Sequence, residues 1–499
     1  MSAARFGYPA AVCLVIVVYI AARFWGLTGS CLWFDEIYSL HAAEHDLGGL
    51  FRFVGLDLIH PPLFYLLLKI WITIGGEQLV WLRSLPVVLA IIAIAPFMGL
   101  CRELKLGRWP ALFALFLLAV NGSAIKYSQE VRMYSLLMCL SLFSAWLFFR
   151  YVNSKTSIAV LLVINILLVH SHYFGWLVVG SEIIVASLYF RGKLFRLLAV
   201  GGVTAASFLP WLLVVLGSRN EGGGLAQNVG WIAQPGLAEI GTLILNLAEP
   251  FYYRSSSTEP VANLVVVIPM LAVAVTVGGL YLVVRSTHAD GPRLEPVVVM
   301  LVTPLVVVFV ASWILPYSFW GTRHLIIVFP LFAIVAAAMV AEIVSSHLRI
   351  AIVSVVVLLS CVAAIATLRI INPEQSWCVA EQILTTSAAT TKRVVVTEDL
   401  IAYHAWFALK GKDVSIEKLE GLPGATEDTA FFLPRGFDGV RRVAFDDLGN
   451  GEATLLLRMR EWNRHAPPII ALEEAGYTLG IPRVVDAADT KVIVLDIRK

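Results

Sequence analysis

The sequence has few charged residues. Asp, Glu, Lys and Arg make up only 14% of its 499 residues, whereas 59% are hydrophobic, and the mean hydropathy is +0.81. Soluble domains usually carry about 25% charged residues. A net charge of only +2 and the lack of a basic arm argue against a nucleic-acid-binding protein. The composition therefore indicates a chain that crosses a membrane many times.

Cysteine is also scarce. The chain has six cysteines, with no CxxC motif and no Cys/His spacing typical of a metal site. Four of them lie in apolar runs: Cys13, Cys101, Cys139 and Cys361. The other two, Cys31 and Cys378, could pair with each other, but the sequence does not decide this.

Charge is unevenly distributed along the chain. Charged residues make up about 10% of residues 1–371 but about 27% of residues 372–499, an ordinary value for a soluble domain. We therefore predict a membrane domain over 1–371 and a soluble domain over 372–499. Strand-like runs (393–399, 429–434 and 491–497) and helix-like runs (400–411 and 467–477) indicate that the second domain is a small α/β domain.

Eleven apolar segments are long enough, or nearly so, to cross a hydrocarbon core of about 30 Å. They are residues 8–26, 79–100, 109–122, 131–149, 156–171, 173–190, 195–216, 261–284, 295–316, 324–344 and 350–370. A further segment, 62–75, is shorter and contains Lys69. If this segment lies on the outer surface as an interfacial helix, every basic cluster of the short loops falls on the cytoplasmic side. The sequence thus predicts about eleven transmembrane helices and one interfacial helix, with the C-terminal domain outside.

The first predicted outer loop contains an acidic pair, Asp35 and Glu36, in the stretch WFDEIYSL. Loop carboxylates are most often solvated, but these two have apolar neighbours close to the membrane surface. Partial burial and a neighbouring like charge both raise the pKa of a carboxyl group. A carboxylate tuned in this way can take a proton from a hydroxyl group. We therefore predict that Asp35 and Glu36 are catalytic.

Positively charged side chains lie at the outer ends of other predicted spans. Lys126 and Arg132 belong to NGSAIKYSQEVRMYSLL, and Arg323 to GTRHLIIVFP. Each arginine could simply reach the interface, but several cations at one leaflet suit a phosphate group. We predict that these three residues bind a donor phosphate. Neighbouring side chains are predicted to bind substrate: His60, Tyr127, Glu130, Tyr134, His172, Tyr173 and His324.

Histidines occur twice in these outer segments. His60 precedes Pro61-Pro62, which can start the interfacial helix. His170 and His172 form an i, i+2 pair that does not share a helix face. The sequence shows no third ligand beside this pair, so hydrogen bonding is favoured over metal binding. No cofactor is firmly implied, and a divalent metal is possible but unsupported by any motif.

Carboxylates opposite cations suit transfer from a phosphate leaving group to a hydroxyl acceptor, because fixed cations stabilise the charge that collects on the departing phosphate. A nucleotide sugar is not normally supplied on the outer face of a membrane. A lipid-linked phosphate is available there, with its tail among the spans. These considerations predict a lipid-linked donor.

The ordered set WFDE, HPPL, QEVRMYSL, HSHY and GTRHL resembles the GT-C glycosyltransferases of the protein O-mannosyltransferase and lipid A aminoarabinose transferase superfamily. The resemblance covers roughly residues 8–345. It implies an inverting transfer of one sugar from a polyprenyl-phosphate donor to a hydroxyl group of a protein, lipid or glycan. The reaction is expected at the outer face of the cytoplasmic membrane.

The resemblance also implies roles for individual residues. Asp35 matches the catalytic aspartate of the family, and Glu36 matches the acid that follows it. Arg132 matches a residue that contacts the donor phosphate, and His60 matches the histidine of an HPP motif. Arg323 aligns with an Arg-aromatic pair, although His324 stands where tyrosine is common.

The residues alone leave two other functions open. A lipid-linked sugar flippase or transporter would also use charges among many spans. Transporters usually contain repeats and midplane polar groups, whereas here no repeat is evident and the polar groups cluster at one face. A membrane scaffold or receptor would leave the acidic pair and the outer arginines unexplained. The Gly-rich segment 217–260 is predicted to be a loop, either a lid or a plain connector.

Overall fold

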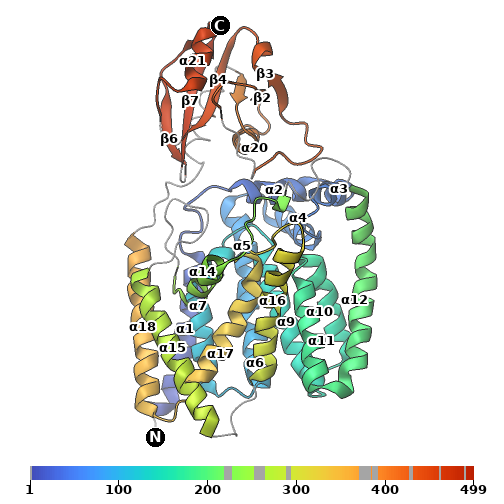
Figure 1. The fold of residues 1–499 in the computed structure, drawn as a ribbon, viewed down its shortest axis with the longest axis vertical. Coiled ribbons are helices and arrows are strands. Elements are labelled where there is room, and N and C mark those ends of the chain that lie inside the picture. Colours follow the sequence, from blue (N-terminus) through green and yellow to red (C-terminus); the bar gives the residue numbers. More distant parts are fainter. Residues whose placement is uncertain are drawn as a thin grey trace.

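The computed structural model describes residues 3–218, 228–251, 264–287, 294–369, 384, 392–425, 431–459, 462–487 and 490–499. They form an upright helical bundle with a smaller sheet domain at one end (Figure 1). The helices of the bundle are α1 (Ala3–Phe24), α2 (Phe34–Glu44), α3 (Leu47–Asp57), α4 (Leu63–Gly75), α5 (Leu79–Ile92), α6 (Ile94–Glu103), α7 (Arg108–Val120), α8 (Gly122–Tyr127), α9 (Tyr134–Val152), α10 (Ile158–Ser171), α11 (Gly175–Tyr189), α12 (Arg191–Ser218), α14 (Leu237–Ala248), α15 (Leu264–Thr287), α16 (Glu295–Ile314), η1 (His324–Ile327), α17 (Val328–Glu342) and α18 (Ser346–Arg369).

A helix occupies each of the eleven predicted spans within the described residues. Eight of these helical segments are long and apolar enough to cross a membrane. The other three, α7, α10 and α11, are shorter, but they pack against the long helices and stand among them. The predicted polytopic helical architecture is therefore confirmed.

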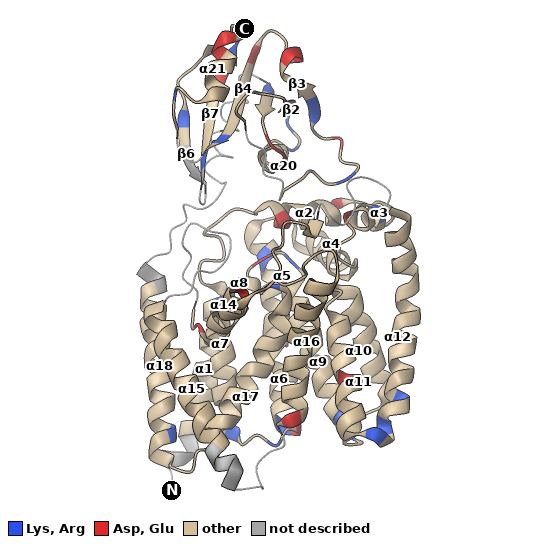
Figure 2. Cartoon of the chain, viewed as in Figure 1, with Lys and Arg blue, Asp and Glu red and all other residues tan. Residues whose placement is uncertain are grey.

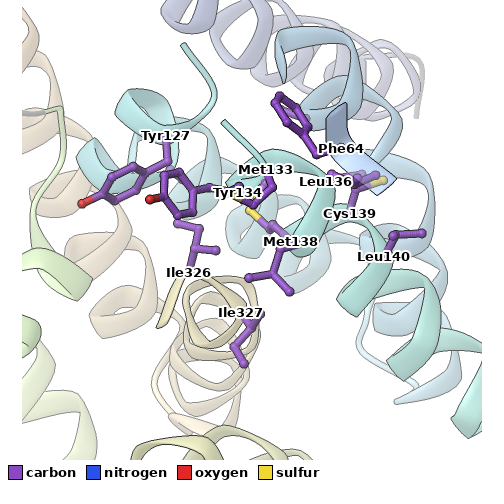
Figure 3. Packing of buried hydrophobic residues seen from close by; sticks show 14 of the residues in the cluster. Phe64, Tyr127, Met133, Tyr134, Leu136, Met138, Cys139, Leu140, Ile326 and Ile327 are labelled. Atoms are coloured by element: carbon purple, nitrogen blue, oxygen red, sulfur yellow. The ribbon is translucent and has the colours of Figure 1, made fainter. Parts of the chain in front are cut away.

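Helix α9 lies at the centre of the bundle. Most of its side chains are buried, and it contacts α5, α6, α10 and α11. Figure 3 shows Tyr134 and Met138 of α9 close to Ile326 and Ile327, which come from the segment where η1 leads into α17. The residues just before α9 are consequently held by a packed core and provide a rigid support for Arg132.

Helices α2, α3 and α4 gather at the end of the bundle that faces the sheet domain (Figure 1). The charge of Lys69 in the apolar helix α4 is accommodated by contacts with α2. Its ammonium group donates to the backbone carbonyls of Ala43 (3.3 Å) and His45 (2.5 Å). These carbonyls lie at the carboxyl end of α2, where a cation is favourable. Helix α4 thus packs on α2, as expected for a surface helix rather than a twelfth span.

The predicted loop 217–260 contains a helix, so that prediction was wrong in part. Helix α14 packs against α8 and α15. Its carboxyl end is attached to α8 through Asn121, whose amide donates to the carbonyls of Asn246 (3.0 Å) and Leu247 (3.3 Å). The glycines dominate the pattern of this segment, but the apolar run that follows them buries Leu243.

The C-terminal domain is a mixed sheet between two helices. Its elements are β1 (Arg393–Val396), α20 (Asp399–Ala408), β2 (Ser415–Glu420), β3 (Arg441–Ala444), η3 (Phe445–Asp447), β4 (Glu452–Met459), α21 (Pro467–Glu474), β5 (Thr478–Leu479), β6 (Arg483–Ala487) and β7 (Thr490–Arg498). The strand order is β3-β2-β1-β4-β7-β5, and β6 also pairs with β7. Strands β1 to β4 pair in parallel, whereas β7 is antiparallel to its partners.

Alternating side chains of β1 point to the two faces of the sheet, which pack against α20 and α21 respectively. Val394 and Val396 join the core that includes α20, and Val395 joins the core that includes α21. The predicted α/β domain, both of its helices and the strands at β1 and β7 are present. The predicted strand at 429–434 is wrong over its described part, because residues 431–434 form no strand. The predicted boundary between 371 and 372 lies outside the described residues.

The two ends of the bundle differ in charge. Figure 2 shows that Lys and Arg residues gather at the end of the bundle opposite the sheet domain. At the sheet-domain end, Cys31 is disulfide-bonded. Cys13, Cys101, Cys139 and Cys361 are free, and Cys378 lies outside the described residues.

Candidate active site

Asp35 meets two arginines at the sheet-domain end of the bundle. It lies in the first turn of α2, and its Oδ2 atom is 3.7 Å from Nη1 of Arg323 and 3.9 Å from Nη2 of Arg132. The Asp35 side chain is 27% exposed, whereas that of Arg132 is 6% exposed. The structure therefore brings together one accessible carboxylate and two cations from three distant parts of the sequence.

Arg132 is held in place by backbone and side-chain contacts. Its Nη1 donates to the carbonyl of Asp35 (3.2 Å) and to the hydroxyl of Ser39 (3.3 Å). Its Nε lies buried with no hydrogen-bond partner among the described residues. A buried guanidinium with a spare donor suits an anionic ligand, since charge-assisted hydrogen bonds are the strong ones.

Glu36 occupies a different environment from Asp35. Its carboxylate accepts from Nε (3.0 Å) and Nη2 (2.8 Å) of Arg83, which lies on α5. It also accepts from the backbone N–H groups of Trp33 (3.1 Å) and Val131 (3.0 Å). Glu36 is only 1% exposed. Its oxygens are thus engaged in fixing the start of α2 against α5 and the segment before α9.

Lys126 and its aromatic neighbours lie on α8 and at the start of α9. Lys126 lies on α8, where its ammonium is 3.7 Å from the carboxylate of Glu130 and 5.1 Å from the centre of the Tyr127 ring. Tyr127 packs edge-on against Tyr134, with ring centres 5.2 Å apart. Tyr134 in turn lies 6.2 Å from the ring of His324. These contacts link the predicted site residues of α8 and α9 to His324 at the start of η1.

Three histidines converge beside Arg132 and Arg323. The ring centre of His172 is 5.3 Å from those of both His60 and His324. Nδ1 of His60 is 3.8 Å from the Asp57 carboxylate. Burial raises the pKa of Asp57 to about 7, against the opposing effect of Arg132. Burial also lowers the pKa of His60 and His172 well below the usual value, so both rings are neutral at pH 7.

An apolar cavity of about 280 Å³ adjoins this histidine cluster. It is lined by Leu58, Ile59, His172, Tyr173, Phe174, Phe208, Leu212, Val215, Val229, Ile232, Phe319 and His324. The Tyr173 hydroxyl donates to the carbonyl of Leu58 (3.4 Å) and accepts from the Trp211 indole (3.3 Å). The cavity therefore places an apolar space directly beside polar groups that can hold a phosphate.

The segment that follows residue 227 reaches the same site. The Trp231 ring centre is 5.6 Å from Cζ of Arg323. Asn228 donates to the backbone carbonyl of Asp57. These contacts agree with the interpretation of the 217–260 segment as part of the site, although its function as a lid stays a prediction.

The C-terminal domain covers the segments that carry the two aspartates. Phe431 packs edge-on against Trp33 and Phe34, at ring distances of 6.1 and 5.2 Å. Arg435 donates to the carbonyl of Leu56 (2.6 Å) and to the side chain of Asn228 (3.3 Å). Trp33 and Phe34 immediately precede Asp35 in the sequence, and Leu56 immediately precedes Asp57. We propose that the domain positions both aspartates.

Arg435→Ala is therefore expected to reduce catalytic turnover. Hydrogen bonds from charged groups contribute about 1.5–3 kcal/mol, and their loss should loosen the turn around Asp57 and lower kcat about tenfold or more. The measurement is kcat in purified protein, compared with Arg498→Ala. Arg498 is an exposed arginine of the same domain, paired with Glu452. Wild-type kcat in Arg435→Ala would show that the domain does not position the aspartates.

The predicted site residues lie near one another, and two further residues contact them, Arg83 and Asp57. The sequence patterns predict a span around Arg83 but no function for it. They predict no function for Asp57 either. The signal for Arg83 was a lone arginine in an apolar run, which is costly unless it is paired. The signal for Asp57 was its position three residues before His60, although such spacing alone does not identify a partner.

Comparison with known proteins identifies the fold. No protein-family model and no curated protein matches the sequence. Among solved structures, ArnT from Cupriavidus metallidurans bound to undecaprenyl phosphate matches 97% of this chain and 97% of its own, at 13% identity and a TM-score of 0.59. The chain has the GT-C fold. The apo state of the same ArnT matches this GT-C chain over 99% of its length and 98% of the ArnT chain, at 13% identity and a TM-score of 0.55.

The matches to ArnT extend over the GT-C helical bundle and the C-terminal domain, because they cover nearly the whole of both chains. They confirm the predicted fold class. At this level of identity the likeness concerns the fold, and the chemistry of the site has to be argued from its own residues.

Proposed function

We propose that this protein is an inverting glycosyltransferase that moves one sugar from a polyprenyl-phosphate donor to a hydroxyl acceptor. The observation that carries the proposal is the meeting of Asp35 with Arg132 and Arg323 at 3.9 and 3.7 Å. The apolar cavity beside the histidine cluster offers space for the first part of a polyprenyl chain. The ArnT of the same fold was solved with undecaprenyl phosphate, which agrees with this class of donor.

In the proposed reaction, Asp35 takes the proton of the acceptor hydroxyl group. The hydroxyl oxygen forms a bond to the anomeric carbon while the bond from that carbon to the phosphate oxygen breaks. The electron pair of the broken bond passes to the phosphate, and attack from the opposite face inverts the configuration. Arg132 and Arg323 stabilise the charge on the departing polyprenyl phosphate. For Glu36, which the sequence predicts to be catalytic, we propose instead that it positions the start of α2, because its oxygens are already occupied.

The ion pairs of Asp35 suggest how the donor prepares the site. Both arginines lie against the Asp35 carboxylate, at 3.9 and 3.7 Å. A phosphate group competes for the same cations and would draw them away from the carboxylate. Asp35 then becomes available to the acceptor proton only when the donor is bound, which protects the site from unproductive chemistry.

We propose that the site lies at the outer face of the cytoplasmic membrane. Basic residues gather at the opposite end of the bundle, which by the positive-inside rule is expected to be cytoplasmic. Cys31 is disulfide-bonded close to Asp35, and disulfides persist in oxidising compartments outside the cytoplasm. Both observations favour an extracytoplasmic site and an extracytoplasmic C-terminal domain.

Mass analysis of envelope glycans tests the proposed function whichever molecule is the acceptor. Cells with the wild-type protein are expected to contain a glycoside that carries one additional sugar. Cells without the protein, or with Asp35→Asn, are expected to lack that sugar. Identical glycans in all three would contradict the proposal. In proteoliposomes, donor translocation without glycoside formation would support a flippase instead.

Arg132→Ala is expected to impair use of the donor. Loss of a charge-assisted contact to phosphate corresponds to about 1.5–3 kcal/mol, or roughly 10- to 100-fold in the KM for the donor. The measurement is donor KM at saturating acceptor. Arg52→Ala is the matched control, because Arg52 is an exposed arginine of α3 at the same end of the bundle. An unchanged donor KM in Arg132→Ala would move the phosphate site elsewhere.

A further inference from the structure

His60, His172 and His324 form a compact cluster that the sequence pattern did not reveal. They come from the α3–α4 turn, the α10–α11 turn and the start of η1. One ring nitrogen from each lies within 4.8 Å of the other two. The neighbouring His170 belongs elsewhere, since its Nδ1 bonds the Ile166 carbonyl and its ring packs on Phe208. The sequence paired His172 with His170, whereas the fold pairs it with His60 and His324.

Three buried ring nitrogens of this cluster have no hydrogen-bond partner among the described residues. His60 and His172 are each 3% exposed. Both nitrogens of His60 and the Nε2 of His172 have no hydrogen-bond partner among the described residues. Buried polar atoms are nearly always satisfied, and leaving them unsatisfied costs free energy. A ligand that binds at the centre of the cluster would remove this cost.

We propose that His60, His172 and His324 bind a divalent metal ion, with Zn²⁺ as the preferred ion. Neutral imidazole is the most common protein ligand for metals. Three histidines with one open position are a recurrent zinc arrangement. This proposal concerns metal binding and does not depend on the proposed glycosyl transfer.

Asp57 can orient His60 as a metal ligand, and nearby carboxylates reduce the positive charge around the proposed ion. The Asp57 carboxylate is 3.8 Å from Nδ1 of His60. Carboxylates commonly orient a metal-binding histidine through the nitrogen that faces away from the metal, so His60 would ligate through Nε2. The carboxylate of Asp35, together with that of Asp57 when it is ionised, offsets part of the positive charge of Arg132 and Arg323, which would otherwise repel a cation.

His172 must change one contact to ligate. Its Nδ1 accepts a hydrogen bond from the N–H of Phe174 at 3.0 Å. Ligation through Nε2 puts the ring proton on Nδ1 and gives up this bond. Zinc binding should therefore perturb the Phe174 amide, which provides a local signal of ligation. The fourth position of the ion would be open to a water molecule or an oxygen of a bound anion.

The experiment uses purified full-length protein that has been stripped with a chelator. Zn²⁺ is added and its stoichiometry measured by elemental analysis, and Co²⁺ is added separately as a spectroscopic probe. We expect one ion per chain and the visible absorption bands of Co²⁺ in a nitrogen-ligated tetrahedral site. His172→Ala and His324→Ala are expected to lose the ion and the bands. His170→Ala, the matched control, is expected to keep both.

A second variant keeps the test decisive if the alanine variants are unstable. Asp57→Asn leaves all three ligands in place and is expected to weaken metal affinity about 10- to 100-fold. Absence of stoichiometric metal from the wild-type protein would overturn the proposal. Binding that survives in His172→Ala and His324→Ala would also overturn it. Metal binding without any glycosyl transfer would leave this proposal standing and contradict only the proposed function.

Discussion

Asp35→Asn is expected to lower the rate of sugar transfer by about 10²- to 10⁴-fold, because positioned general bases contribute that much to catalysis. The substitution keeps the shape of the side chain and removes its capacity to take a proton. Folding should change little, since the Asp35 side chain is 27% exposed and its ion pairs are long. Its backbone carbonyl, which accepts from Ser39 and Arg132, is unaffected.

Donor binding should survive this substitution or improve. Arg132 and Arg323 no longer interact with a carboxylate in the variant, so both become more available to phosphate. The measurements are single-turnover transfer and the Kd for polyprenyl phosphate in purified protein. Asp46→Asn is the matched control, because Asp46 caps α3 through the Gly49 N–H and asparagine caps equally well. Wild-type turnover in Asp35→Asn would exclude Asp35 as the base.

Glu36→Gln is expected to destabilise the protein by about 3–5 kcal/mol, as is usual when one partner of a buried ion pair is removed. Arg83 would keep its charge in a buried position, where it is only 5% exposed. Arg83 also donates to the carbonyls of Leu27, Ser30 and Cys31, at 2.8, 2.8 and 2.9 Å. The pair therefore ties the chain before α2 to α5, and its loss should disorder the segment that carries Asp35.

Thermal unfolding in detergent measures this effect. Lys392→Met is the control, because Lys392 pairs with Asp413 at 3.6 Å while both side chains remain largely exposed, and exposed pairs contribute about 0–1 kcal/mol. The double variant Glu36→Gln, Arg83→Met should lose less stability than the sum of the single variants, because the two residues act as a unit. A Glu36→Gln protein with wild-type stability but no turnover would instead make Glu36 catalytic.

The spans could be predicted from sequence because membrane helices follow from local properties. Apolar runs of sufficient length mark the helices, and the basic residues of short loops mark one face. The segment containing Lys69 was separated from the spans by the same rule. The structure then supplies the local reason, which is the contact of Lys69 with the end of α2.

The proximity of Asp35, Arg132 and Arg323 was also predictable, because all three lie next to the same ends of helices that cross the membrane. The partners of these residues were not. Arg83 looks like any other residue of an apolar run until Glu36 is placed beside it, and that contact spans 47 positions of the sequence. Such pairs depend on how helices pack, which no short pattern encodes.

The histidine cluster shows the same limit. His170 and His172 form the visible pair, yet the local backbone turns their rings apart. His324 lies beside His172 because η1 packs against α9, which in turn contacts α10 and α11. In the C-terminal domain, most strands lack a clear alternation of apolar and polar residues, because both faces of the sheet are covered by helices.

We expect polyprenyl phosphate to bind where Asp35 pairs with Arg132 and Arg323. A structure of the purified protein with polyprenyl phosphate is the decisive measurement. The phosphate should lie within hydrogen-bond distance of both arginines, with the lipid entering the cavity lined by Tyr173 and Phe208. A phosphate bound elsewhere, with the pairs of Asp35 to both arginines intact, would refute this assignment.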